Sequence, residues 1–235
     1  MSKVAVVTGA SQGIGATLAD YFARQGYNVA LLARSKSQLQ TVQEQLINNY
    51  QVNITIHPTD VSDQTAVNDS VQAILDYHQR IDVLFNNAGV AHKGTSELET
   101  EKFEQMVQVN LLGAFYVLQA VTTHMKQRGS GYIFNLISRS GVIARPTVGG
   151  YAATKFGLKG YSEALYKELA PLGIKVTALH PGWVETPMTR DVDVPANEKI
   201  QTEDIANMVD ALLRLHTFTH ISDIVIEPRQ AIGLA

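Results

Sequence analysis

Apolar runs of strand length alternate with segments of helical periodicity along the 235 residues of the chain. In the first pair, residues 3–9 (KVAVVTG) are mostly apolar and end in a turn, and residues 15–26 (GATLADYFARQG) follow with helical spacing. Strands that are apolar on both faces and are joined through helices are typical of a parallel sheet covered on both sides. The sequence therefore predicts one α/β domain over residues 1–235, a doubly wound parallel sheet of about seven strands.

The remaining predicted elements keep this order. Strands are expected at residues 28–34, 52–61, 82–89, 131–138, 174–182 and 221–228, and helices at 35–49, 64–78, 100–128, 151–173 and 202–215. Ser35 lies where the second helix begins and is expected to be its N-cap. In the long helix, Asn110 and Gly113 are both poor helix formers, which predicts a kink or a local widening of π type there.

Composition narrows the class of protein. Charged residues make up 17% and hydrophobic residues 45% of the chain, as in a globular protein. The net charge of −3 argues against nucleic acid or an anionic membrane as the main partner. The absence of cysteine excludes disulfides and cysteine-ligated zinc. No apolar run approaches the length of a membrane span, and the apolar N-terminal stretch is too short for a signal peptide, so we expect a cytoplasmic protein with no membrane partner.

Glycines and small polar residues follow nearly every predicted strand, and in a parallel sheet these positions share the edge where ligands bind. The first such turn contains Gly9, Gly13 and Gly15, directly before a helix. Glycines there let the backbone approach a pyrophosphate, whose charge the free amides at a helix N-terminus favour. The alternative is a purely structural turn. No Gly-Lys-Ser/Thr follows, which excludes a P-loop.

The residues after the second and third strands suggest which dinucleotide binds. The second strand ends at Ala33 and Arg34, without the carboxylate that would hold the ribose hydroxyls of NAD. Arg34 with Ser35 suits a 2′-phosphate, so NADP(H) is preferred over NAD(H); the alternative is a solvated arginine at a strand end. Asp60 and Val61 are placed to contact the adenine, although this segment also makes a good turn and helix cap.

Tyr151 and Lys155 lie four residues apart in a predicted helix, so they share one face. A lysine cation one turn from a phenol favours the phenolate and is expected to lower the tyrosine pKa below its usual value. Such pairs are common by chance, and alone this one is better explained by ordinary helix surface.

Taken together, these motifs resemble the short-chain dehydrogenase/reductase family over essentially the whole chain. The resemblance implies a Rossmann-type fold, an oligomer, and a catalytic tetrad of Asn110, Ser138, Tyr151 and Lys155, with Ser138 and Tyr151 at the expected separation. It also implies a sheet-stabilising motif at residues 86–89 and contacts of residues 181–186 with the nicotinamide and the pyrophosphate. The cofactor-binding residues expected on these grounds are Gly9, Ser11, Gly13, Ile14, Gly15, Arg34, Ser35, Asp60, Val61, Asn87, Ala88, Gly89, Tyr151, Lys155, Pro181, Gly182, Val184 and Thr186.

The expected activity is reduction of a small-molecule carbonyl, or oxidation of the matching alcohol, by hydride transfer. Tyr151 is expected to be the general acid or base, and Ser138 to hydrogen-bond the substrate oxygen. Lys155 would tune Tyr151 and hold the nicotinamide ribose, and the Asn110 carbonyl would hold a water. The alternatives are a physiological dehydrogenase of a hydroxy amino acid, sugar or small alcohol, and a non-catalytic protein that senses NADP(H).

Three further features are left open by the sequence. Ala153, Gly157, Gly160 and Ala164 form a stripe of small residues on one helix face, which predicts a homodimer or homotetramer unless the stripe packs on the chain's own sheet. Arg139 and Arg145 either pair with an anionic group of the substrate or are solvated. His216 and His220 are four apart, but no carboxylate completes a metal motif, so no metal site is expected.

Overall fold

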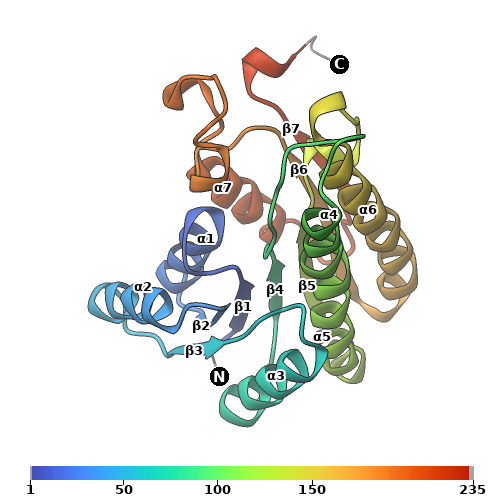
Figure 1. Cartoon of the computed structure of the whole chain (residues 1–235). Helices are drawn as coiled ribbons and strands as arrows, with labels where there is room; N and C mark the ends of the chain where they lie inside the picture. The colour runs from blue at the N-terminus through green and yellow to red at the C-terminus, as the bar shows by residue number, and fades with distance from the viewer. Residues whose placement is uncertain (1, 233–235) are drawn as a thin grey trace.

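Seven parallel strands form one sheet in the computed structural model of the chain, which describes residues 2–232. The strands are β1 (Val4–Thr8), β2 (Asn28–Ala33), β3 (Ile54–Pro58), β4 (Val83–Asn86), β5 (Gly131–Leu136), β6 (Ile174–Pro181) and β7 (Asp223–Ile226). Their order is β3-β2-β1-β4-β5-β6-β7, so the direction of winding reverses between β1 and β4. The predicted doubly wound sheet, a single domain of Rossmann type, is confirmed (Figure 1).

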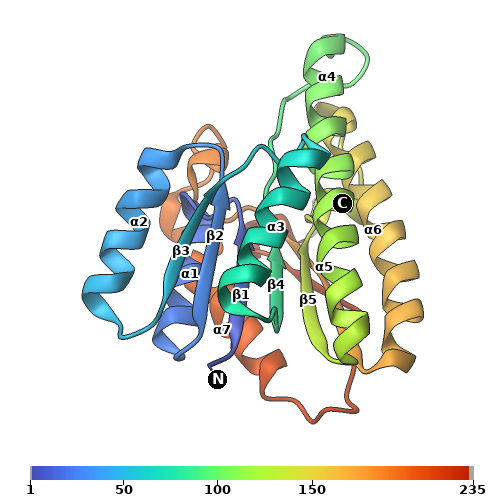
Figure 2. The same ribbon diagram turned by 90° about the horizontal axis from the view of Figure 1, so that it is seen from below.

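The helices cover both faces of this sheet (Figures 1 and 2). They are α1 (Gly13–Arg24), α2 (Lys36–Asn49), α3 (Gln64–His78), α4 (Thr100–Met106), α5 (Ala114–Arg128), α6 (Gly149–Leu169) and α7 (Thr202–Leu213). Short 3₁₀ turns lie at Arg139–Gly141, Pro146–Val148, Ala170–Leu172, Pro187–Thr189, Ala196–Glu198 and Arg229–Ala231.

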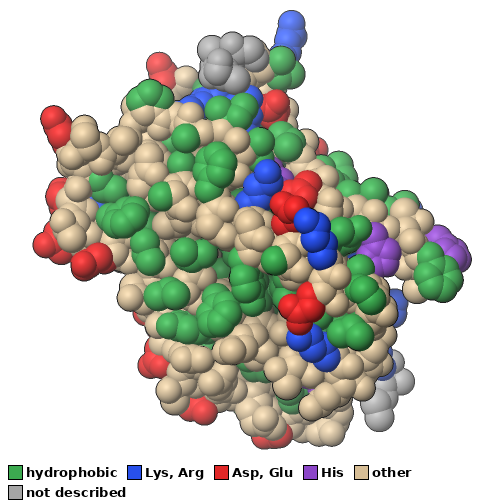
Figure 3. All heavy atoms as spheres, turned by 90° about the vertical axis from the view of Figure 1, so that its right-hand side faces the viewer, with side chains coloured by type: hydrophobic (Ala, Val, Ile, Leu, Met, Phe, Trp, Pro, Cys, Tyr) green, Lys and Arg blue, Asp and Glu red, His purple; other side chains and the backbone are tan. Residues whose placement is uncertain are grey.

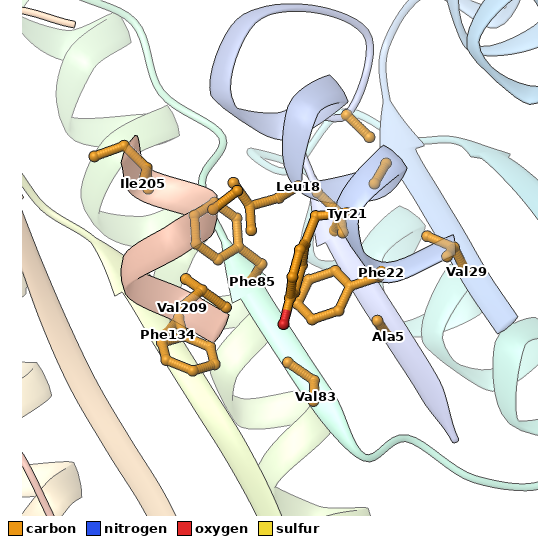
Figure 4. Close-up of a cluster of buried hydrophobic side chains, with 14 of the residues drawn as sticks. Ala5, Leu18, Tyr21, Phe22, Val29, Val83, Phe85, Phe134, Ile205 and Val209 are labelled. Atoms are coloured by element: carbon orange, nitrogen blue, oxygen red, sulfur yellow. The ribbon is translucent and has the colours of Figure 1, made fainter. Parts of the chain in front are cut away.

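Two apolar layers hold the helices to the sheet. One layer joins β1, β2, β4 and β5 to α1, α2 and α7, and Figure 4 shows Leu18, Phe22 and Phe85 among its side chains. The other joins the opposite face to α3, α5 and α6 through residues such as Val117 and Leu158. All five residues of β1 are buried, as expected of a central strand that contacts helices on both sides.

Local signals set several of the element boundaries. The Ser35 side chain accepts a hydrogen bond from the Gln38 amide and caps α2, as predicted, and Asp63 caps α3 through the Thr65 and Ala66 amides. The strand expected over residues 52–61 is shorter, because its pairing with β2 ends at Pro58. Beyond it, Asp60 accepts hydrogen bonds from the Ser62 amide and hydroxyl and forms a turn.

The long helical stretch Thr100–Arg128 is continuous but changes its winding. Residues Val107–Gly113 form a π-helical segment, which confirms the predicted widening around Asn110 and Gly113. A Cβ on Gly113 would lie 2.9 Å from the Val61 carbonyl oxygen, so only glycine allows the close approach of these backbones. This stretch is long and apolar enough to span a membrane, which the sequence had not led us to expect. Half of its most apolar part is buried inside the fold, as in the core helix of a globular protein.

Candidate active site

A cleft of about 600 Å³ runs along the carboxyl ends of the strands, from the residues after β2 to the first turns of α6. The predicted site residues that line it are Gly9, Ser11, Gly13, Ile14, Arg34, Ser35, Asp60, Val61, Asn87, Ala88, Gly89, Tyr151, Lys155 and Thr186. The cleft therefore brings together segments from both halves of the chain, at the edge where the winding of the sheet reverses.

The predicted site residues and the residues that line the cleft overlap only in part. Six predicted residues do not line the cleft: Gly15, Asn110, Ser138, Pro181, Gly182 and Val184. Ten lining residues lie outside the expected catalytic and cofactor-binding sets: Gln12, Ala33, Gln38, Thr59, Val90, Val109, Leu136, Ile137, Pro187 and Met188. Most of these ten are sequence neighbours of predicted ones, so the strand-end signal would have found them if it had been extended by a few residues.

The glycine turn between β1 and α1 exposes backbone amides to the cleft. Gly9 and Gly13 have φ angles of 64° and 55°, a left-handed region that glycine adopts without strain. A Cβ on Gly15 would lie 2.2 Å from the Gly9 carbonyl oxygen, so this glycine serves the packing of helix on turn. The N-cap of α1, Gln12, makes no side-chain capping hydrogen bond, which leaves the first amides of α1 without a side-chain partner. Such amides suit a phosphate group.

The loop after β4 is fixed to this turn through Thr8. The Thr8 hydroxyl accepts hydrogen bonds from the Asn87 and Ala88 amides at 2.9 and 3.0 Å. The Asn87 side chain donates back to the Thr8 carbonyl at 2.8 Å. Asn86 points into the sheet, where its amide donates to the Asn135 side chain at 3.2 Å. Residues 86–89 thus tie β1, β4 and β5 together where the strands end.

The end of the cleft beside β2 carries positive charge. Arg34 is exposed at the rim, and the first turn of α2 contains no acidic residue. Asp60 also lines the cleft: burial raises the pKa of this carboxyl, but hydrogen bonds from Ser62 and the charge of Arg34 outweigh burial and lower it. Arg34, Ser35 and Gln38 can therefore surround an anionic group.

At the other end, Lys155 lies beneath Tyr151 in the first turns of α6. Its Nζ atom donates to the Leu136 carbonyl at 3.1 Å and lies 5.6 Å from the centre of the Tyr151 ring. Burial raises the pKa of Tyr151 to about 12, against a hydrogen bond with Ser138 that lowers it, and burial lowers the pKa of Lys155 to about 8. The direction for Tyr151 is opposite to the predicted one, because desolvation disfavours both charged forms and the ammonium is engaged by a carbonyl.

Ser138 stands at the end of β5, beside the Tyr151 hydroxyl. Its Oγ accepts a hydrogen bond from the Ser140 amide at 3.1 Å. The hydroxyl keeps its O–H for donation, and its hydrogen bond with Tyr151 lowers the pKa of the phenol, as donation to the phenol oxygen does. Such a donor next to a phenol is suited to a substrate oxygen.

Asn110 is fully buried in the π-helical segment and holds the loop after β4 in place. Its side-chain oxygen accepts from the Val90 amide, and its side-chain nitrogen donates to the Val90 carbonyl, both at 2.8 Å. The same nitrogen donates to the Thr154 hydroxyl at 3.2 Å. The Asn110 side chain therefore links the loop that lines the cleft to α6, the helix of Tyr151 and Lys155.

The segment after β6 closes the cleft over the glycine turn. Thr186 lies so close to Gly13 that a Cβ there would be 3.3 Å from its methyl group. Val184 forms a bridge with Ile200, and Lys199 pairs with Glu185 at 2.9 Å. Gly182 is required by packing, because a Cβ would lie 2.7 Å from Pro228. Gly182 and Val184 therefore hold this segment in place through contacts with Pro228 and Ile200, although neither lines the cleft.

Arg139 and Arg145 both contact other side chains of the chain, and the stripe of small residues on α6 faces outward. Arg139 is neither solvated nor directed to an anion in the cleft: it forms an ion pair with Glu227, and its side chain is 12% exposed. Arg145 stacks on the Trp183 ring, with 5.0 Å from the guanidinium carbon to the ring centre. All four residues of the stripe on α6 are exposed, so the stripe does not pack on the chain's own sheet. Within residues 2–232, no cluster of three or more histidine or acidic side chains suits a metal ion.

Comparisons with known proteins agree with this architecture. A family model described as short chain dehydrogenase matches residues 3–196. An uncharacterized oxidoreductase of Staphylococcus epidermidis is 34% identical over 227 residues, which are 96% of this chain and 97% of that protein.

Solved structures are similar over nearly the whole chain. A β-ketoacyl-[ACP] reductase from Bacteroides thetaiotaomicron is 37% identical, with a TM-score of 0.86 and 99% of both chains covered. An alcohol dehydrogenase from the archaeon Thermococcus sibiricus, complexed with 5-hydroxy-NADP, is 31% identical, with a TM-score of 0.91 and 97% of both chains covered. A 3-ketoacyl-(acyl-carrier-protein) reductase from Brucella melitensis, complexed with NADH, is 29% identical, with a TM-score of 0.88 and 98% of both chains covered.

Proposed function

The chain belongs to the short chain dehydrogenase family of oxidoreductases, and we propose that it reduces a small-molecule carbonyl with NADP(H), or oxidises the matching alcohol, with Tyr151 as the general acid or base. The observation that carries this proposal is the shared cleft. One continuous hollow is lined by the glycine turn at Gly13, by Arg34 at one end, and by Tyr151 and Lys155 at the other. An elongated cofactor with its phosphates at the helix N-terminus would bring its reactive end to Tyr151.

The residues present fit such a cofactor. The first amides of α1 have no side-chain cap and lie beside the cleft, where they can hold a pyrophosphate. Lys155 would hold the nicotinamide ribose, and the segment that contains Thr186 would cover the phosphates. When bound, the cofactor supplies or accepts the hydride at the substrate carbon.

The chain's own part in the reaction is proton transfer and charge stabilisation. In reduction, the Tyr151 O–H donates its proton to the carbonyl oxygen, while the Ser138 O–H hydrogen-bonds the same oxygen as negative charge develops there. The Tyr151 phenol is protonated at neutral pH, but its raised pKa makes it a weaker acid than a free phenol, so the proposed role requires the pKa to fall when cofactor and substrate are bound. In oxidation, Tyr151 acts as the base, and the proposed water at the Asn110 carbonyl would link Lys155 to solvent.

The preference for NADP(H) rests on the residues around Arg34. Arg34, Ser35 and Gln38 line the cleft, and no acid occupies the end of β2. Asp60 partly offsets the charge of Arg34, so we expect a moderate preference rather than exclusive use of one cofactor.

The test of the proposed function is turnover. The purified protein is assayed with a panel of ketones, diketones and alcohols and both cofactors, and consumption or formation of NADPH is followed by absorbance. A non-catalytic NADP(H) sensor is the competing function. The sensor would be favoured if the wild type binds the cofactor but converts no member of the panel faster than Tyr151→Phe does.

We also propose that the chain forms a homodimer or homotetramer through α6. The stripe of Ala153, Gly157, Gly160 and Ala164 is exposed, and Phe156 beside it is 43% exposed. On the side of the molecule that carries α6, charged side chains gather in a narrow band with apolar surface beside it (Figure 3). A Cβ on Gly160 meets no atom within 4 Å, so Gly160→Leu would obstruct a partner without disturbing the chain itself. A sedimentation coefficient unchanged by Gly160→Leu would contradict this interface.

A further inference from the structure

The turn that carries Ser138 leaves the sheet at the end of β5 and needs support from elsewhere. The Ile137 amide still donates to the Leu179 carbonyl of β6 at 2.8 Å. Beyond it, the backbone turns back on itself, and the Gly141 amide donates to the Ser138 carbonyl at 2.9 Å. The position of the Ser138 hydroxyl therefore depends on what holds this turn against the rest of the fold.

An ion pair joins the turn to the end of the last strand. Arg139 directly follows Ser138, and it pairs with Glu227, whose side chain is 25% exposed. Glu227 directly follows Ile226 of β7, and the Ile226 carbonyl accepts a hydrogen bond from the Gly182 amide at 2.7 Å. The backbone beside Glu227 is thus fixed to the residues after β6, and Glu227 connects this framework to the Ser138 turn.

A second contact from β7 reaches the same turn through His180. This histidine is fully buried at the end of β6, with its Nε2 atom 2.8 Å from an Asp223 oxygen. Its Nδ1 atom lies 3.4 Å from the Ser138 carbonyl oxygen. Two contacts therefore connect β7 and the residue after it to the turn. Asp223 reaches the Ser138 carbonyl through His180, and Glu227 pairs with the Arg139 side chain.

We propose that Glu227 and Arg139 are positioning residues, which hold the Ser138 hydroxyl in place for the substrate oxygen. This inference rests on the proposed function. A shielded ion pair is weak evidence for stability, since apolar residues of the same size often stabilise a fold as well. An ion pair does fix the orientation of its two side chains and so of the turn that carries Arg139. A catalytic hydroxyl on such a turn must be held to within about 0.5 Å of its productive position. Pairing with Glu227 also withdraws the Arg139 charge from the substrate.

The experiment combines changes at the pair with a change at Ser138. Glu227→Gln keeps the shape of the side chain and removes its charge, and it is made in the wild type and in Ser138→Ala. We measure kcat, the KM of the ketone, the Kd of NADPH and the Tm for each variant. In the wild-type background, kcat should fall about tenfold to a hundredfold, the range that a small misplacement of a catalytic group produces, with the Kd of NADPH nearly unchanged.

In the Ser138→Ala background, the same change should lower kcat by less than about twofold, because the hydroxyl that the pair positions is already gone. Arg139→Met should behave like Glu227→Gln, and Arg139→Lys, which keeps the charge, should retain more activity. The matched control is Arg80→Gln, which breaks the ion pair with Asp82 at the amino ends of the strands, away from the cleft, and should leave kcat unchanged.

Three results would overturn the proposal. The first is an unchanged kcat in Glu227→Gln, and the second is an equal loss in both backgrounds. The third is a rise in KM confined to anionic ketones, which would make Arg139 a substrate-binding residue. If Glu227→Gln does not fold, the exchanged pair Arg139→Glu with Glu227→Arg takes its place and should recover kcat relative to Arg139→Glu alone; no recovery in a folded protein overturns the proposal. Wild-type-like activity in Ser138→Ala and Tyr151→Phe would instead refute the proposed function.

Discussion

The two ends of the cleft are built in different ways. At the end proposed to bind the cofactor phosphates, here called the cofactor end, the site consists largely of backbone: the glycine turn and the uncapped amides of α1. At the end proposed to carry out catalysis, here called the catalytic end, it consists of side chains held by residues distant in sequence. Lys155 contacts the Leu136 carbonyl, and the Ser138 turn is tied to β7 through Arg139 and Glu227.

This difference has consequences for how each end responds to substitution. A site built of backbone amides is damaged by an added Cβ, because the amides must approach the ligand closely, and the side chains at its rim, such as Arg34, affect which cofactor is preferred. A side-chain site tolerates small shifts of the backbone poorly and depends on one functional group at one position. Changes at the cofactor end should therefore appear in cofactor affinity or folding, and changes at the catalytic end in kcat.

The largest effect is expected at the catalytic end, from Tyr151→Phe. The change removes the proton donor and little volume, so turnover should fall by a factor of roughly 10²–10⁴. The Kd of NADPH, measured by fluorescence titration, should stay near that of the wild type. Retention of half the wild-type activity would show that another group donates the proton.

The next effect is a change of cofactor at the other end. A charge-assisted hydrogen bond contributes on the order of 1.5–3 kcal/mol, which corresponds to a preference for NADPH of about tenfold to a hundredfold. The double variant Ala33→Asp with Arg34→Ile should reverse the ratio of kcat/KM for the two cofactors, mainly through KM. Equal use of both cofactors by the wild type, or no shift in the variant, would mean that Arg34 is only a solvated surface residue.

A smaller effect tests the backbone character of the glycine turn. In Gly9→Ala, the Cβ would lie 2.6 Å from the Asn87 side-chain nitrogen, at a φ of 64°. Gly129 has nearly the same φ, 63°, but a Cβ there has its nearest neighbour at 3.8 Å. The left-handed conformation alone costs about 1–2 kcal/mol in each variant, and Gly9→Ala should lose more stability and also NADPH affinity. Equal unfolding free energies and wild-type NADPH binding would contradict the close-packed turn.

The smallest effect is a pH dependence of the free energy of unfolding, which arises from two histidines near the cofactor end, His57 and His78. Burial, and then the charge of His78, lowers the pKa of His57 to about 4, and burial lowers that of His78. Between pH 6.5 and about 4 the unfolded chain therefore binds more protons than the folded one, so stability should fall as the pH falls through this window. Melting curves should show this slope, and His57→Gln, which takes up no proton, should reduce it; an unchanged slope would assign it to other groups.

Much of the fold and of the cofactor end could be predicted from the sequence. The alternation of apolar runs and helical segments is local, and so are the glycines, Ser35 and the pair Asn110 and Gly113, which marked the π-helical segment. The shared face of Tyr151 and Lys155 was also visible, because helix periodicity is a property of neighbouring residues, whereas Ser138 was added by the family resemblance. The sequence therefore determined which residues are present at the sheet edge and in what order.

Tertiary structure decided what surrounds them. The partner of Arg139 is Glu227, far along the chain, and only the packing of β7 beside β6 brings the two together. The direction of the Tyr151 pKa was mispredicted for the same reason: the spacing placed Lys155 one turn away, but the Leu136 carbonyl engages its ammonium and burial disfavours both charges. Desolvation and long-range contacts depend on the complete fold, because they arise from atoms that only folding brings into contact.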